Sequence, residues 1–232
     1  MKKAQICDNL EQIKRKIENV CRKIGRDSSE VMLVAVSKTK PVSYIYEALE
    51  CGQIHFGENR MQELEVKIKE FESKDVSWHM VGNLQTNKIK LIAEKVKWVH
   101  SIEKLKYLKE FEKHANGNKI EALIQVNISG ENQKGGVEPE DLAAILKAAS
   151  NFENVTVRGL MGMATFVDNP EDVRKEFKML KNLFDEHQKY NKGSVKLEEL
   201  SMGMSNDMEV AIEEGATMVR IGSDIFGARN YE

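Results

Sequence analysis

Hydrophobic positions along this chain alternate between the spacing typical of helices and that typical of strands. Apolar residues recur at steps of four and three through residues 6–24, which predicts an amphipathic helix that ends at Gly25. The β-forming run at residues 31–36 then predicts a buried strand with Lys38 at its carboxyl end. Pro41 favours a new helix directly afterwards, because the first turn of a helix does not need the N–H that proline lacks.

The same alternation continues to the end of the chain. Seven more strands are predicted, at residues 53–56, 76–81, 96–100, 120–126, 155–161, 195–200 and 217–221. Helical patterns separate them, at residues 41–50, 64–71, 89–93, 105–111, 139–149, 173–187 and 207–214. A polar loop is expected at residues 127–136. His187 continues the apolar stripe of its helix, so we expect it to pack in the core.

Eight strands that alternate with helices, without a break in composition, are the pattern of an α/β protein. We therefore predict a single domain over residues 1–232, a (β/α)8 TIM barrel with an extra N-terminal helix. An open doubly wound sheet is the alternative. The dinucleotide-binding fingerprint GxGxxG is absent after the first predicted strand, which disfavours a Rossmann fold.

The charge balance narrows the range of partners. Lys and Arg number 35, and Asp and Glu number 37, for a formal net charge of -2 with both signs interspersed. This pattern lacks the basic stripe of a nucleic-acid-binding protein, so no nucleic-acid partner is expected. The N-terminus has no apolar signal region, and no apolar run approaches the length of a membrane span. We therefore expect a cytoplasmic protein without membrane contact.

The cysteines and histidines favour neither a disulfide framework nor a metal site. Cys7, Cys21 and Cys51 are odd in number and lack CxxC spacing, which argues against a disulfide framework and favours a reducing compartment. The histidines form no HExxH motif, and the chain has no compact Cys/His cluster. No metal ion is expected.

Lys38 is the first candidate for chemistry. In a barrel, functional groups gather on the loops that follow the strands. A lysine near apolar neighbours and another cation has a lowered pKa, which favours a neutral amine that can form a Schiff base with an aldehyde. A salt-bridged or surface lysine is the alternative, and Lys40 is a second candidate that its place before Pro41 assigns to helix entry.

Two glycine- and serine-containing segments follow the last two predicted strands, Ser201–Ser205 and the pair Gly222 and Ser223. Backbone N–H groups and hydroxyls at such positions bind phosphate in many barrels, although ordinary turns with helix caps are the alternative. Arg220 could pair with a phosphate, face a ring nitrogen or form a buried ion pair. An imine lysine, a phosphate site and an arginine fit pyridoxal phosphate (PLP), and they also fit a Schiff-base sugar-phosphate aldolase.

Several motifs occur in the order typical of one known family. They are residues 34–41 (VAVSKTKP), 56–59 (FGEN), 78–79 (WH), Gly82, 84–85 (LQ), 87–88 (NK), 159–163 (GLMGM), 200–205 (LSMGMS), 219–222 (VRIG) and 225–227 (IFG). On these residues the chain resembles the pyridoxal phosphate homeostasis proteins along nearly its whole length. The resemblance implies a barrel like the N-terminal domain of alanine racemase, with PLP as the cofactor.

The resemblance also implies roles for nine cofactor-binding residues. Lys38 would be the imine lysine, and Arg220 would face the pyridine nitrogen. The segments Ser201–Ser205 and Gly222–Ser223 would surround the phosphate, with Asn59 and His79 near the cofactor. The implied residues are Lys38, Asn59, His79, Ser201, Gly203, Ser205, Arg220, Gly222 and Ser223. Two departures are Ser223, where the family often has threonine, and Arg60, where an aromatic residue is common.

The sequence favours a carrier over an enzyme. Racemases that share this barrel carry a second, β-rich domain and an opposing tyrosine from a partner subunit, whereas here the predicted barrel accounts for the whole chain. Arg220 beside the pyridine nitrogen would disfavour its protonation and weaken carbanion chemistry. We expect a monomeric PLP-binding protein that takes part in PLP homeostasis without robust catalysis and hands the cofactor to PLP-dependent apo-enzymes. A weak PLP-dependent amino-acid racemase is the alternative.

Overall fold

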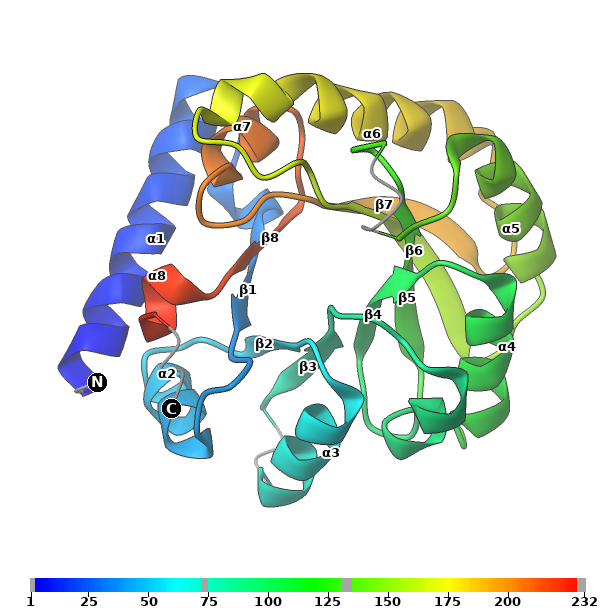
Figure 1. Ribbon diagram of the computed structural model, residues 1–232, viewed down its shortest axis with the longest axis horizontal. Coiled ribbons are helices and arrows are strands. Elements are labelled where there is room, and N and C mark those ends of the chain that lie inside the picture. The colour runs from blue at the N-terminus through cyan, green and yellow to red at the C-terminus, as the bar shows by residue number, and fades with distance from the viewer. Residues whose placement is uncertain (1–2, 72–74, 131–134, 229–232) are drawn as a thin grey trace.

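Eight parallel strands close into a barrel in which each strand pairs with the next along the chain and β8 pairs with β1 (Figure 1). The structure is a computed structural model, and it describes residues 3–71, 75–130 and 135–228. The strands are β1 (Met32–Val36), β2 (His55–Glu58), β3 (Ser77–Met80), β4 (Trp98–Ile102), β5 (Ile120–Val126), β6 (Val155–Gly162), β7 (Val195–Ser201) and β8 (Met218–Ile221). The predicted TIM barrel is confirmed.

Helices surround the barrel on the outside (Figure 1). The α-helices are α1 (Lys3–Lys23), α2 (Val42–Glu50), α3 (Met61–Glu70), α4 (Leu105–His114), α5 (Leu142–Ala149), α6 (Arg174–Glu186), α7 (Met208–Glu213) and α8 (Ser223–Phe226). Short 3-10 helices are η1 (Ser28–Glu30), η2 (Thr86–Leu91), η4 (Pro139–Asp141), η5 (Pro170–Val173) and η6 (His187–Tyr190). The extra helix α1 packs against α2, α7 and α8 and covers that side of the barrel.

Three elements differ from the sequence-based expectation. In place of the helix expected at residues 89–93 the chain forms the 3-10 helix η2, which ends at Leu91, so that of the three apolar residues behind the prediction only Ile89 lies in it. Strand β2 begins at His55 rather than Gln53, since the Gln53 amide binds the carbonyl oxygens of Leu33 and His55 before the strand starts. Strand β4 lies two residues further along the chain than predicted.

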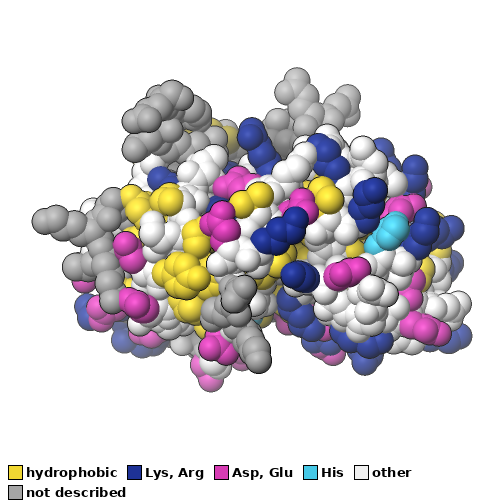
Figure 2. Space-filling model, turned by 90° about the horizontal axis from the view of Figure 1, so that it is seen from below, with side chains coloured by type: hydrophobic (Ala, Val, Ile, Leu, Met, Phe, Trp, Pro, Cys, Tyr) yellow, Lys and Arg dark blue, Asp and Glu magenta, His cyan; other side chains and the backbone are white. Residues whose placement is uncertain are grey.

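His187 is buried, and its Nδ1 lies 2.7 Å from the carbonyl oxygen of Leu183, so its expected packing role is confirmed. The expected polar loop includes residues 131–134, which lie outside the described residues. The protein surface in Figure 2 carries acidic and basic side chains interspersed over the face shown. Among the described residues, no helix combines the length and the apolar character needed to cross a membrane.

The expectation that the cysteines form no disulfide was wrong. Cys7 of α1 and Cys51, directly after α2, form a disulfide with their Cα atoms 5.5 Å apart. The packing of α1 against α2 brings these residues together across 44 positions of sequence, which cysteine spacing alone does not show. Cys21 is buried and is the free cysteine.

Candidate cofactor site

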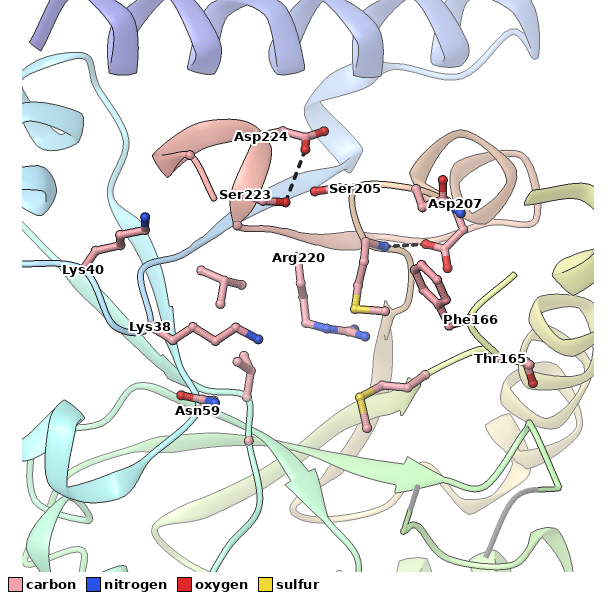
Figure 3. Close-up of a pocket in the computed structure, with 18 of the residues that line it drawn as sticks. Lys38, Lys40, Asn59, Thr165, Phe166, Ser205, Asp207, Arg220, Ser223 and Asp224 are labelled. Atoms are coloured by element: carbon pink, nitrogen blue, oxygen red, sulfur yellow. Dashed lines mark hydrogen bonds between the residues drawn. The ribbon is translucent and has the colours of Figure 1, made fainter. Parts of the chain in front are cut away.

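A cavity of about 760 Å³ opens at the carboxyl ends of the strands. Its walls come from the segments that follow β1, β2, β3, β6, β7 and β8 (Figure 3). Six of the nine expected site residues line it: Lys38, Asn59, Ser205, Arg220, Gly222 and Ser223. The other three, His79, Ser201 and Gly203, are not among the lining residues and are fully or almost fully buried.

Lys38 enters the cavity from the loop after β1. Strand β1 ends at Val36, and Thr39 has a positive φ of 63°, so the chain turns sharply directly after Lys38. The Lys38 side chain extends across the cavity toward Arg220 (Figure 3). Lys40 also lines the cavity, but its Nζ donates a hydrogen bond to the carbonyl oxygen of Ala228 at 2.8 Å. Lys38 therefore has the more central position of the two amines.

Arg220 forms the inner wall of the cavity. It lies on β8, is 5% exposed, and donates hydrogen bonds to the Ser201 hydroxyl at 2.7 Å and to the carbonyl oxygen of Gly162 at 3.0 Å. Burial lowers the pKa of Arg220 to about 10, although the nearby Asp207 carboxyl raises it. The guanidinium is therefore still charged at neutral pH. Its two hydrogen bonds fix its orientation.

A chain of hydrogen bonds continues from Arg220 through the barrel interior. His100 Nδ1 lies 2.9 Å from Ser201 Oγ, His79 Nδ1 lies 2.8 Å from His100 Nε2, and His55 Nδ1 lies 3.0 Å from His79 Nε2. Burial lowers the pKa of His79 and of His100 well below the ordinary value, which keeps both rings neutral. A guanidinium only donates, so Ser201 accepts from Arg220 and can donate its own proton to His100. Ser201 thus contacts Arg220 directly, and His79 is linked to Arg220 only through His100 and Ser201.

Two segments supply hydroxyl groups to another wall of the cavity, one containing Ser205 and the other Ser223. Ser205 and Ser223 line the same part of the cavity (Figure 3). The segment before Ser205 turns at Gly203, whose φ is +90°, and it is closed by the Asp207 carboxyl, which accepts a hydrogen bond from the Met204 N–H at 2.6 Å. Burial raises the pKa of Asp207, while this hydrogen bond and Arg220 lower it. The two hydroxyls on this wall of the cavity fit a phosphate group.

Asn59 completes the cavity after β2. Its Oδ1 is buried and has no hydrogen-bond partner among the described protein atoms. A buried unpaired acceptor costs about 1–3 kcal/mol. Figure 3 shows the amide nitrogen of Asn59 on the side of Lys38, where a bound molecule could accept a hydrogen bond from it. The neighbouring loop requires glycine, because a Cβ at Gly82 would lie 2.2 Å from the carbonyl oxygen of Asn59. Glycine at this position therefore permits the close approach of the two backbone segments.

These residues fit PLP. Lys38 would offer an amine to the aldehyde, Ser205 and Ser223 would offer hydroxyls to the phosphate, and Arg220 would offer a charged donor to the ring. Among the described residues, no group of three or more His, Cys, Asp or Glu side chains is arranged to hold a metal ion.

Sequence reasoning missed a buried charge cluster beside the cavity and the part of the rim that follows β6. The missed rim residues include Thr165 and Phe166, and Phe166 is 83% exposed. The cluster includes Lys67 and Glu58. One signal was visible: Lys67 lies on the apolar face of its predicted helix, where lysine is rarely buried without a partner.

Comparisons with known proteins agree with the fold. Residues 9–230 match the family model for the N-terminal domain of alanine racemase. Solved alanine racemase from Corynebacterium glutamicum has a TM-score of 0.72 at 12% identity, with 98% of this chain and 61% of that chain covered, which shows the shared fold alone. The fold and cavity thus define a barrel of the alanine racemase N-terminal class.

Relatives of similar length identify the family within that class. A pyridoxal phosphate homeostasis protein of Aquifex aeolicus is 44% identical over 97% of this chain and 99% of its own length. The structure of PipY from Synechococcus elongatus, with PLP bound, has a TM-score of 0.84 at 33% identity, covering 96% of this chain and 100% of that chain. The chain belongs to the pyridoxal phosphate homeostasis protein family.

Proposed function

We propose that this protein binds PLP as an imine with Lys38 and takes part in PLP homeostasis without robust catalysis. The observation that carries this proposal is the convergence of Lys38, Arg220 and the Ser205 and Ser223 hydroxyls on one cavity. Relatives named pyridoxal phosphate homeostasis proteins and the PLP-bound PipY structure support it.

Each residue has a distinct role in the proposal. Bound PLP supplies an aldehyde that reacts with amines and a ring that can withdraw electrons. Lys38 holds the aldehyde carbon, and Ser205, Gly222 and Ser223 hold the phosphate. Asn59, which directly follows β2, contacts the bound cofactor through its side-chain amide. His79, Ser201 and Gly203 act from the adjoining buried layer, where they hold Arg220 and the Ser205 segment.

Arg220 favours binding of PLP over catalytic turnover. Its charged guanidinium disfavours a proton on a neighbouring pyridine nitrogen, and an unprotonated ring is a weaker electron sink. Racemisation also needs proton transfer from two sides. No tyrosine, histidine or cysteine is found among the described residues that line the cavity. Weak racemase activity remains the second candidate, on the basis of the shared barrel.

We further propose that the protein acts as a cytoplasmic monomer that passes PLP to PLP-dependent apo-enzymes. A homeostasis role needs access to the enzymes that use the cofactor. The residues that we propose to contact the aldehyde, the phosphate and the ring all come from one chain, which supports a monomer. Cys7 and Cys51 do not line the cavity, so reduction of their disulfide in the cytoplasm would leave the site's residues in place.

Visible absorption spectroscopy tests the proposal. Wild-type protein with added PLP is expected to show imine absorbance that borohydride removes, whereas Lys38→Ala loses it and Lys40→Ala keeps it. Chiral analysis of alanine and other amino acids incubated with the PLP-loaded protein is expected to show no racemisation at ordinary enzymatic rates. Robust racemisation would instead show that the protein is a PLP-dependent racemase. An unchanged spectrum in Lys38→Ala would contradict the proposed role of Lys38.

A further inference from the structure

A buried charge cluster lies directly behind the loop that carries Lys38. The Lys67 Nζ of α3 donates three hydrogen bonds of 2.8 Å each, to the carbonyl oxygen of Ser37 and to the carboxylates of Glu58 and Glu63. Lys67 and Glu58 are 4% and 0% exposed. The ammonium therefore joins helix α3 and strand β2 to the residue that precedes Lys38.

The same cluster holds the residue that follows Lys38. Glu63 Oε1 accepts a hydrogen bond from the Thr39 N–H at 2.6 Å. The Ser37 hydroxyl donates to Glu58 Oε1 at 2.6 Å. Both neighbours of Lys38 are thus tied to one cluster, and Lys67 bridges the two carboxylates.

The turn held in this way is one that the sequence would not adopt by itself. Thr39 has a φ of 63°, in the left-handed region that β-branched residues disfavour. Such a conformation persists only where surrounding contacts enforce it. The Glu63 carboxylate, fixed by Lys67, supplies such a contact to the strained residue itself.

Stability is a poor explanation for this cluster. Burial of charges is costly, and apolar side chains of similar volume often serve a core equally well or better. Burial raises the pKa of Glu58 to about 7 even beside the Lys67 ammonium. The buried charges are better explained by their effect on the loop that carries Lys38, because they fix the direction of the Lys38 side chain.

We propose that Glu58, Glu63 and Lys67 are positioning residues that aim the Lys38 amine at the aldehyde of bound PLP. The inference rests on the proposed function of Lys38. In the step that they favour, the neutral amine nitrogen bonds to the aldehyde carbon to form C=N. The aldehyde oxygen leaves as water with the two protons of the amine, and no oxidant or reductant is needed. Correct placement of reacting atoms accelerates such a step.

Helix α3 provides a matched control for the test. Glu63 and Glu65 each pair with a lysine four residues later, Lys67 and Lys69, and their side chains are 22% and 23% exposed. Only Glu63 reaches the Lys38 loop. We expect Glu63→Ala to slow imine formation with PLP, followed by stopped-flow absorbance, and to weaken PLP binding about tenfold, the effect of one lost hydrogen bond. Glu65→Ala is expected to match wild type.

Two further variants separate positioning from folding. Glu63→Asp keeps the charge but shortens the reach to Thr39, so it is expected to slow imine formation as Glu63→Ala does, and it replaces that variant if Glu63→Ala does not fold. Glu63→Gln keeps an oxygen at the same reach and is expected to restore most of the rate. Circular dichroism checks that each variant is folded.

The outcomes distinguish this inference from the function on which it rests. Wild-type imine kinetics in folded Glu63→Ala and Glu63→Asp, with imine formation abolished in Lys38→Ala, would overturn the positioning role alone. Equal slowing in Glu65→Ala would also overturn it. If Lys38→Ala still formed the imine, the proposed role of Lys38 would fail first.

Discussion

Arg220 donates a hydrogen bond from Nη1 to the hydroxyl oxygen of Ser201 at 2.7 Å, in a layer of the barrel behind the cavity wall. Arg220 lines the cavity, whereas Ser201 is fully buried and does not. The first serine of the Ser201–Ser205 segment therefore supports the arginine, and the last serine reaches the cavity. One motif thus contributes to both the ring side and the phosphate side of the proposed PLP site.

Replacement of Ser201 tests this division of roles. Ser201→Ala would leave buried polar atoms of Arg220 and His100 without their shared partner. We expect the free energy of unfolding to fall by about 1–3 kcal/mol, measured by urea denaturation. Binding of free phosphate, measured by competition with PLP, is expected to stay close to wild type, and Ser205→Ala is the comparison that weakens it. A large loss of phosphate competition in Ser201→Ala would instead place Ser201 at the phosphate.

The buried histidines give stability a dependence on pH. Burial holds the pKa of His79 well below 6.5 in the folded protein, so the unfolded chain takes up a proton that the folded protein does not. Stability is therefore lost as pH falls below about 6.5, by up to about 1.4 kcal/mol per pH unit for such a histidine. We expect His79→Gln to reduce the slope of unfolding free energy against pH between pH 6.5 and 5, measured by urea denaturation.

Buried carboxyls such as Glu58 act in the opposite direction, because a raised pKa favours the folded protein as pH falls. The informative quantity is therefore the difference in slope between variant and wild type. His114→Gln, on the outer helix α4, is the control. Equal slopes for wild type and His79→Gln would show that His79 is not held neutral by burial.

The disulfide predicts a specific count of thiols. Unreduced protein, unfolded in denaturant and titrated with a thiol reagent, is expected to expose one thiol, that of Cys21. Reduced protein is expected to expose three. Reduction should lower the free energy of unfolding by about 2–4 kcal/mol, since the bond constrains the unfolded chain. Three thiols in carefully unreduced protein would show that Cys7 and Cys51 are not joined.

The barrel could be predicted because its signals are local. Each strand is an apolar run, each helix has its own periodicity, and strand ends such as Lys38 and Arg220 share one face in a closed barrel. The depth at which a residue lies along the barrel axis, in contrast, depends on the register of neighbouring strands, which the local sequence does not reveal. Ser201 and His79 lie at strand ends in the sequence, yet the register of their neighbours places them in the buried layer behind the cavity.

Contacts between residues far apart along the chain could not be predicted from the sequence either. Cys7 meets Cys51 only because α1 packs against α2, and Lys67 meets Ser37 only because α3 packs behind the β1 loop. Neither spacing nor composition encodes such contacts. The buried Lys67 on an apolar helical face was the one visible sign that α3 supports a charged cluster.

The attachment site of PLP is the most direct test of the account. PLP-loaded protein is reduced with borohydride, digested and analysed by mass spectrometry, so that the lysine bonded to the cofactor is identified. Lys38 and Lys40 both line the cavity, and we predict the phosphopyridoxyl group on Lys38. Attachment at Lys40 or at a lysine outside the cavity, with Lys38 unmodified, would contradict it.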